Sequence, residues 1–433
     1  MLEASAGAAS SNVPVKEFSR GWTILLLALA GAATTVSVTL LYGFGTLVLP
    51  LQQAFGWSRG DLQIAISCMS GGVVVASQLA GWMNLRWGMR RVTLISLLLL
   101  PFAFFGLTAV HGSIYWLYLG FFLVPIVGAG VTFVTWTQLV SWWFDRRRGM
   151  ALALVLCGSG LAAAILPPAL NWAIERWDWR AGFVLLGLLP LLLTLPLAWY
   201  FLQPTPPSAS ESSAAKPKSA KSSVNAAAHN SKDNSSFKLS LRSRKFWVLN
   251  ISLTLVVSAV VGMVTNTVPL LRDIGLSATQ ASAVFSSFGL ALISGRLLAG
   301  WLIDRLWAPG VAAVALFMPC IGCLLLWTAD ANSSVVLLTT AVALVGVGAG
   351  AEFDLSAYLI ARYFGLPDYG RLFGIHLGMI TAGSMLAPLM FAAMYQASGG
   401  YGPLLAWCAG CCVVGPLMLL TLGRQPPLAS APA

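Results

Sequence analysis

The chain carries an internal duplication whose period is about half its length. Short soluble repeats have periods of roughly 20 to 50 residues, and a period near 220 positions lies far outside that range. In a sequence that is 58% hydrophobic, such a duplication predicts two related membrane bundles with a transport pathway at their interface. Three residues return together at an offset of 219 positions: Gly43, Pro50 and Gly56 return as Gly262, Pro269 and Gly275.

Composition supports a membrane protein. Only 9% of the residues are charged, against about 25% in soluble domains, so too little polar surface exists to coat a water-soluble core. About 20 apolar residues cross a 30 Å hydrocarbon layer, and the chain holds twelve such runs. We therefore expect an all-α integral membrane fold of twelve transmembrane helices in two six-helix bundles related by a pseudo-two-fold axis. The runs are 21–50, 60–82, 92–110, 114–142, 150–173, 181–202, 246–270, 280–303, 311–328, 333–360, 372–396 and 402–422.

The breaks in the apolar pattern predict the domain boundaries. Residues 1–20 form an N-terminal tail, 21–202 the first bundle, 246–422 the second bundle and 423–433 a C-terminal tail. Residues 203–245 are rich in Ser, Ala, Pro and Lys and bury too little apolar surface to fold, which predicts a disordered linker.

The basic residues indicate orientation. With the N-terminus inside, twenty of the 25 Lys and Arg residues fall on the cytoplasmic side and four outside, a strong positive-inside bias. The net charge of +11 therefore reports topology, and no nucleic-acid partner is needed. We expect a multi-pass monomer of the cell inner membrane with both termini cytoplasmic and the lipid bilayer as its solvent. The histidines and cysteines form no cluster, so no enzyme activity, cofactor or metal is expected.

Three ionisable residues lie well inside the apolar runs: Arg296, Glu352 and Asp354. A charge at mid-span costs about 2.5–3.5 kcal/mol on insertion scales, so each needs a partner or a wet cavity. Arg296 and Glu352 lie at similar depths in helices that run in the same direction. Glu352 and Asp354 are two positions apart, about 200° around a helix, so only one of them is expected to face a central cavity with Arg296 or substrate.

The duplication isolates these charges in one half. The equivalent residues of the first half are Ser77, Thr132 and Val134, none of which is charged. This asymmetry predicts that the second half carries the ion chemistry, while the first half supplies shape and apolar contacts.

Arginine at such a site favours a carboxylate substrate, because its planar fork donates two parallel hydrogen bonds and stays charged. Burial favours the neutral form of a carboxylic acid, so Glu352 or Asp354 is expected to carry a coupling proton while Arg296 holds the anion. The alternative is an ion pair that only pins two helices together. Four further residues are expected either to line the cavity or to pack in the core: Tyr42, Asn266, Trp136 and Gln138.

The loop after the second apolar run, from Gly81 to Arg91, reads GWMNLRWGMRR, and Gly300 to Arg305 reads GWLIDR. Together with the two six-helix halves, these stretches resemble the major facilitator superfamily over essentially the whole chain. That resemblance implies charge contacts that lock the cytoplasmic side when the carrier faces outward. Leu85 stands where the family's first-half motif has aspartate, which moves the expected contact to Asp304. The residues implied as gating groups are Arg86, Arg90, Asp304, Arg305 and Arg371.

Narrower stretches resemble bacterial members of the monocarboxylate porter and oxalate/formate antiporter group. They are YGFG at 42–45, GAEFDLSAY at 350–358, and SGR at 294–296, where such carriers place an arginine that pairs with substrate carboxylate. The resemblance implies a secondary active transporter of a small organic carboxylate, a monocarboxylate or an aromatic-catabolism or lactone acid, with proton-coupled uptake by alternating access. The alternatives are an anion/anion antiporter of the oxalate–formate type and a proton-driven exporter of hydrophobic compounds.

Overall fold

The computed structural model describes residues 14–144, 148–202, 237–303, 305–364 and 369–423. Twelve stretches of this part of the chain are long and apolar enough to cross a membrane, which confirms the predicted helical membrane fold. The first half contains α1 (Pro14–Ala33), α2 (Val36–Phe55), α3 (Arg59–Trp87), α4 (Met89–Thr108), α5 (Tyr115–Val127), the 3₁₀ turn η1 (Gly128–Val131), α6 (Phe133–Trp143), α7 (Arg148–Arg176), α8 (Trp179–Leu189), the π turn η2 (Pro190–Thr194) and α9 (Leu195–Phe201). The second half contains α12 (Arg244–Asp273), α13 (Ala278–Ile303), α14 (Ala308–Trp327), α15 (Val335–Phe364), α16 (Tyr369–Ser398) and α17 (Gly402–Leu420).

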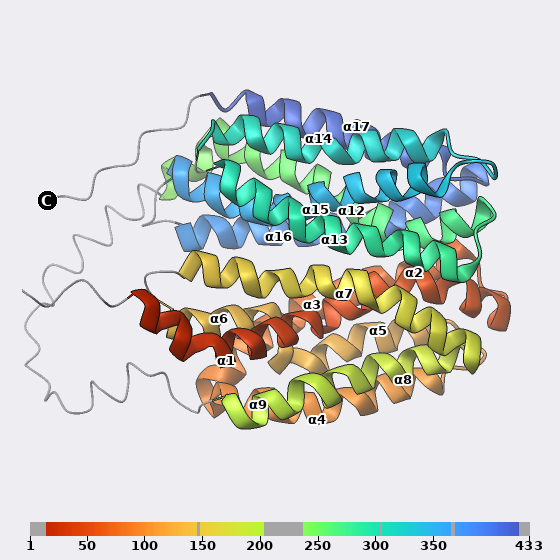
Figure 1. Ribbon diagram of the computed structural model, residues 1–433, viewed down its shortest axis with the longest axis horizontal. Coiled ribbons are helices and arrows are strands. Elements are labelled where there is room, and N and C mark those ends of the chain that lie inside the picture. The colour runs from red at the N-terminus through yellow and green to blue at the C-terminus, as the bar shows by residue number, and fades with distance from the viewer. Residues whose placement is uncertain (1–13, 145–147, 203–236, 304, 365–368, 424–433) are drawn as a thin grey trace, which may run out of the picture.

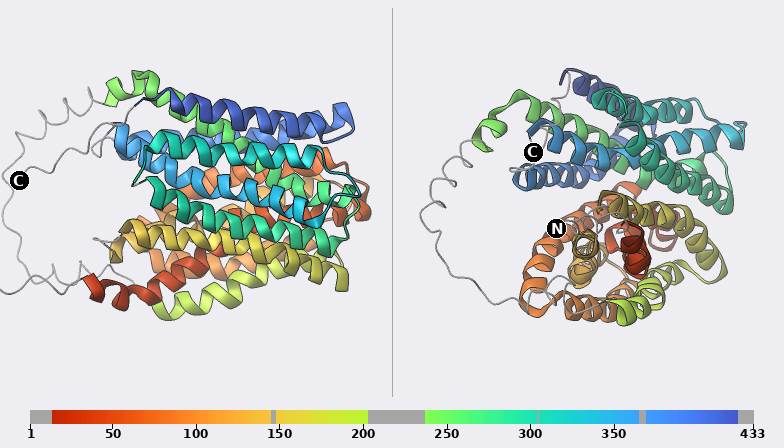
Figure 2. Two further views of the ribbon diagram at one scale, coloured as in Figure 1. Left: turned by 45° about the horizontal axis from the view of Figure 1, so that its top comes forward. Right: turned by 60° about the vertical axis from the view of Figure 1, so that its left-hand side comes forward.

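The two halves form two bundles that lie side by side (Figures 1 and 2). Each bundle has its own apolar core, one built almost entirely from α1–α9 and the other from α12–α17. The bundles meet where α13 packs along α7, α16 along α3 and α12 along α2. Leu41 and Tyr42 of α2 pack against both cores, so they lie at this interface. We call the end where α1 and α12 begin the near end, and the end where α2 and α12 finish the far end (left and right in Figure 1).

The duplication is visible in the way equivalent helices begin. At the start of α3 the Ser58 hydroxyl accepts a hydrogen bond from the Asp61 amide. At the start of α13, 219 positions later, Ser277 and Gln280 bond each other's amides reciprocally. This capping arrangement satisfies amides that have no partner inside the helix. The same local chemistry therefore starts the second membrane helix of each bundle.

Two predicted spans of the first bundle are broken. The run 21–50 divides into α1 and α2 at Thr34 and Thr35, whose hydroxyls donate to the carbonyls of Ala30 and Gly31 at 3.0 and 2.8 Å. Such side-chain bonds compete with the helical ladder. Thr34 also bonds Thr194 of η2 at 2.6 Å, which anchors the break to a distant part of the chain.

The run 114–142 divides at η1 into α5 and α6. The amide of Gly130 donates to Ser96 at 3.0 Å, and the Gly130 carbonyl accepts from Thr93 at 3.0 Å, so two side chains of α4 replace helical partners. A Cβ at Gly130 would lie 2.6 Å from the carbonyl oxygen of Val92, so only glycine allows this close approach. The equivalent helices of the second bundle, α12 and α15, are unbroken over 30 residues each.

Candidate functional site

The three membrane charges lie on two adjacent helices. Arg296 of α13 is only 6% exposed, and its Nε lies 3.3 Å from Oδ2 of Asp354 on α15. The same Nε donates to the carbonyl oxygen of Gly350 at 3.4 Å. The structure therefore pairs Arg296 with Asp354, one of the two carboxylates that the sequence leaves open.

Glycines bring α13 and α15 close enough for this ion pair. A Cβ at Gly350 would lie 2.0 Å from the carbonyl oxygen of Leu292, and one at Gly295 would lie 2.4 Å from that of Val347. Small residues at helix–helix contacts in membranes allow this approach of the backbones. The packing of the two helices therefore positions Arg296 against α15.

The ion pair leaves two buried groups without a partner. Nη1 of Arg296 and Oε2 of Glu352 are both inaccessible to solvent and have no hydrogen-bond partner among the described residues. The side chain of Asp354 is 26% exposed. Because buried polar groups are nearly always hydrogen-bonded, this unpaired donor and acceptor make the surroundings of Arg296 the candidate binding site.

The first bundle reaches the same site. Tyr42 of α2 interacts electrostatically with both Glu352 and Arg296, and its ring centroid lies 5.8 Å from that of Phe288 on α13. Cys157 of α7 is within electrostatic range of Arg296 and of Asp354. The charged site is therefore formed by α13 and α15 and faces groups from the opposite bundle.

The remaining residues that the sequence suggests for the cavity lie elsewhere. Asn266 of α12 accepts a hydrogen bond from Gln63 of α3 at 3.1 Å and so joins the two bundles. Trp136 is fully buried in the core of the first bundle, where its ring packs against Gly31 of α1. Gln138 is half-buried on α6.

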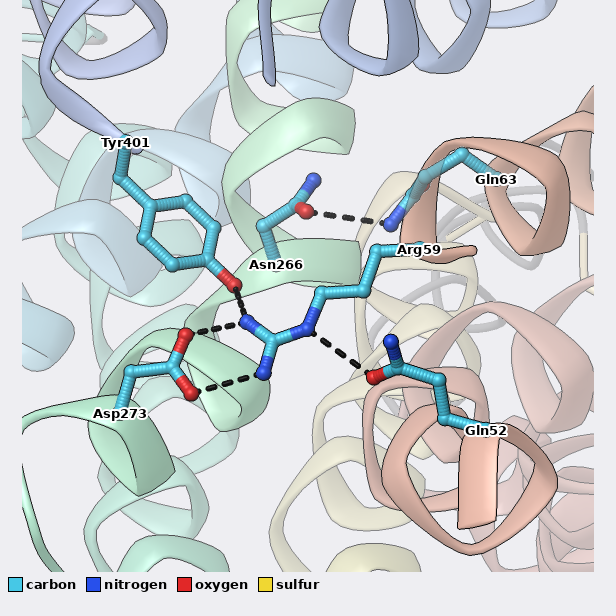
Figure 3. A network of polar contacts seen from close by, with 6 residues as sticks. All are labelled: Gln52, Arg59, Gln63, Asn266, Asp273 and Tyr401. Atoms are coloured by element: carbon cyan, nitrogen blue, oxygen red, sulfur yellow. Dashed lines mark hydrogen bonds and ion pairs between the residues drawn. The ribbon is translucent and has the colours of Figure 1, made fainter. Parts of the chain in front are cut away.

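A polar network crosses between the bundles at the far end (Figure 3). Both terminal nitrogens of the Arg59 guanidinium, on α3, bind the carboxylate of Asp273 on α12. Nη1 also donates to the Tyr401 hydroxyl at 2.6 Å, and Nε donates to Gln52 at 3.2 Å. Burial raises the pKa of Tyr401 well above its ordinary value, so this hydroxyl stays protonated.

This far-end network, Gln52, Arg59, Asp273 and Tyr401, is not predicted from the sequence. The available signal was that Arg59 is one of only four basic residues that the sequence places on the outer side of the membrane. Hydrogen bonds from Asn171 to Thr279 and from Thr279 to Glu175 join α7 to α13 at the same end. These polar contacts hold the two bundles together at the far end.

Three of the proposed gating residues, Arg86, Arg90 and Arg305, lie at the near end. Arg86 lies over the ring of Trp82, and Arg305 over that of Trp301, at 5.5 and 4.0 Å from the ring centroids. These cation–π pairs are another feature that recurs at an offset of 219 positions. Nη2 of Arg90 donates to the Trp199 carbonyl at 3.1 Å.

Two members of the predicted gating set lie outside what the structure describes. Asp304 is not among the described residues, and for Arg371 only the backbone is described. Within the described part of the chain, no group of three His, Cys, Asp or Glu residues is arranged to hold a metal ion.

Two bundles of membrane-spanning helices, with a buried ion pair at the interface between them, are the architecture of a membrane transport protein. The family model described as Major Facilitator Superfamily matches residues 23–306 and 251–433. The chain belongs to this superfamily. Its relatives and the proteins of the same fold are transporters and not enzymes.

Individual relatives are distant but similar over most of the chain. Human monocarboxylate transporter 11 is 26% identical over 396 residues, which is 88% of this chain and 79% of that protein. Monocarboxylate transporter 13 of Bos taurus is 24% identical and covers 93% of this chain and 89% of its own length. The crystal structure of a D-xylose–proton symporter superposes with a TM-score of 0.74 at 16% identity, over 93% of this chain and 97% of that one.

Proposed function

We propose that the chain is a secondary active transporter that moves a small organic carboxylate across the inner membrane, coupled to protons, by alternating access. One observation carries this proposal: Arg296 lies buried between the bundles with Nη1 free of any partner among the described residues. A guanidinium donates two parallel hydrogen bonds to a carboxylate. The similarity to monocarboxylate transporters supports the same substrate class.

Asp354 holds Arg296 in place until substrate arrives. The oxygen Oδ2 of Asp354 lies 3.3 Å from Nε, and Nη1 has no hydrogen-bond partner among the described residues, so Nη1 remains for the incoming anion. A substrate carboxylate can displace Asp354 or bind beside it. The ion pair then serves both as a structural contact and as the resting form of the binding site.

Counting charges supports a proton as the coupling ion. The site holds one guanidinium and two carboxyl groups, Glu352 and Asp354, so binding an anionic substrate adds further negative charge. A proton that enters with the anion keeps this charge constant in a region where uncompensated charge is expensive. Glu352, whose Oε2 lacks a partner among the described residues, is the proposed carrier of that proton.

The proposed orientation places the near end in the cytoplasm, because most basic residues fall on that side. With the far-end network joined, the structure then corresponds to a carrier closed toward the outside. Arg59 and Asp273 lock this closed end in the proposal, and separation of the two bundles there would admit substrate.

Uptake into proteoliposomes tests the proposal. Labelled lactate, benzoate and succinate are offered with and without an inward proton gradient, and one or more should accumulate only with the gradient. Arg296→Lys should lose this uptake while it keeps normal expression and folding, and Arg176→Lys, an exposed far-end arginine, serves as the matched control. Exchange that ignores the proton gradient would indicate an antiporter, and absence of any carboxylate uptake or exchange would overturn the proposal.

A further inference from the structure

The first bundle contains a cavity of about 60 Å³ where its two broken helices meet. One break lies between α1 and α2, and the other between η1 and α6. A buried water needs about 10–15 Å³ of such volume, so the cavity has room for a few waters or for one carboxylate group with one or two further carbon atoms. The cavity wall next to the two breaks is formed by Thr35, Val36, Ser37, Thr132, Phe133 and Val134.

Both breaks present the N-terminus of a helix to this cavity. α2 begins at Val36 after Thr35, and α6 begins at Phe133 after Thr132. Neither threonine caps its own helix with its side chain. The first amides of a helix have no partner within that helix, and the residues that carry them, 36 and 37 in α2 and 133 and 134 in α6, all line the cavity.

Three carbonyl groups next to the same breaks accept side-chain hydrogen bonds. Thr34 and Thr35 donate to the carbonyls of Ala30 and Gly31 in the last turn of α1, and Thr93 donates to the carbonyl of Gly130 in η1. Among the described residues no side chain accepts from the first amides of α2 and α6, so these donors stay open to the cavity. Uncovered amides and the positive ends of two helix dipoles together favour an anion.

A side chain in the cavity wall gives an independent sign of a missing ligand. Thr132 is only 9% exposed, and its hydroxyl has no hydrogen-bond partner among the described residues. A buried hydroxyl without a hydrogen-bond partner is unfavourable. A carboxylate in the cavity would accept from this hydroxyl and from the neighbouring amides.

The cavity of the first bundle corresponds in the duplication to the charged site of the second bundle. Ser77, Thr132 and Val134 line it, and these are the residues that correspond to Arg296, Glu352 and Asp354 in the duplication. At these positions the second bundle has the guanidinium of Arg296, which lies between unbroken helices. The first bundle has no charged residue in the cavity wall and has two helix N-termini instead of the guanidinium.

We propose that this cavity is a second carboxylate-binding site, in which backbone amides of α2 and α6 and the Thr132 hydroxyl hold the anion. The choice of carboxylate over other anions rests on the proposed transport function; the anion site itself rests on the cavity, the two helix ends and Thr132. It is a site within the first bundle, separate from Arg296, and binds without an ion pair.

Thermal unfolding of the purified full chain in detergent, with sodium acetate as the probe, tests this site. Arg296→Gln/Asp354→Asn removes the charged pair, and acetate should still raise the unfolding temperature in this background, since a ligand that binds the folded state stabilises it. Adding Thr132→Val should weaken the apparent acetate affinity by at least about tenfold, the loss of one hydrogen bond to a charged group. Thr132→Val in the otherwise unchanged chain should leave the Arg296-dependent part of binding intact.

The amide contribution is tested with proline at the first position of α6, where its missing N–H does not disrupt the helix. Phe133→Pro should bind acetate more weakly than Phe133→Ala, and Ala278→Pro, at the same position of α13, should leave acetate binding unchanged. The proposal is overturned if acetate does not stabilise the Arg296→Gln/Asp354→Asn protein, if Thr132→Val has no effect in that background, or if chloride at equal ionic strength acts equally. Acetate binding without carboxylate uptake in proteoliposomes would overturn the transport function and leave this site standing.

Discussion

The two bundles differ in chemistry at positions that correspond to each other in the duplication. In the second bundle, Arg296 pairs with Asp354 between two unbroken helices. In the first, the corresponding Ser77 and Val134 border a cavity at two helix breaks. One half keeps its backbone regular and places charge on side chains, and the other keeps its side chains neutral and exposes backbone amides. Under the two proposals above, the duplicated scaffold holds an anion by two different means at equivalent positions.

The largest effect is expected when Arg296 of the second half is replaced by serine, the residue at the equivalent position 77 of the first half. Arg296→Ser removes the only buried guanidinium found among the described residues and leaves Asp354 unpaired. Loss of one partner from a buried pair costs about 2–5 kcal/mol, so carboxylate uptake should fall by at least about 30-fold. Initial uptake rates in proteoliposomes measure this, with Arg176→Lys as control. Uptake within a factor of two of the unchanged chain would remove Arg296 from the binding site.

Glu352→Gln separates binding from proton coupling. With an imposed difference of one pH unit, symport with one proton accumulates substrate about tenfold, which corresponds to about 1.4 kcal/mol. The variant should lose this accumulation and still exchange internal for external substrate, because Arg296 remains. Accumulation ratios and exchange rates in the same vesicles measure both properties. Unchanged accumulation would assign the coupling proton to another group, of which Asp354 is the next candidate.

Asp273→Asn tests the far-end network. It weakens the bidentate contact with Arg59, so the far end should open more often. A cysteine introduced at the buried position of Asn171 should then react with a membrane-impermeant maleimide about fivefold faster, as expected for a net loss of about 1 kcal/mol. Asp178→Asn is the matched control, because Asp178 pairs with Arg180 inside one bundle. Equal labelling in both variants would mean that the network does not hold the far end closed.

Tyr401→Phe should give the smallest effect. It removes one acceptor from the Arg59 guanidinium and keeps the pair with Asp273, so the same labelling assay should show an increase of about twofold, consistent with a net hydrogen-bond contribution near 0.5 kcal/mol. An increase as large as that of Asp273→Asn would show that the tyrosine, and not the ion pair, carries the contact.

The sequence predicted the features that depend on local chemistry. Runs of apolar residues predicted twelve spans, and the duplication placed Arg296, Glu352 and Asp354 in one half. The sequence did not predict the helix breaks at Thr35 and Thr132, because these breaks depend on side chains of other helices, such as Thr194 and Ser96.

The far-end network is a second feature that could not be predicted. Arg59 and Asp273 are 214 positions apart, and nothing in their local sequence relates them. The choice of Asp354 over Glu352 as the partner of Arg296 likewise depends on how α15 turns against α13. Both require the relative placement of whole helices, which hydrophobic patterns do not contain.

The unbroken and broken helices also give the two bundles different mechanical properties. A helix whose hydrogen-bond ladder is interrupted bends more easily at the interruption than a continuous one. The first bundle can therefore bend at Thr35 and Thr132, whereas the equivalent helices α12 and α15 of the second bundle are continuous. We expect the deformation that accompanies opening and closing to concentrate at these two breaks of the first bundle. An anion bound in the cavity between the breaks would therefore slow that movement.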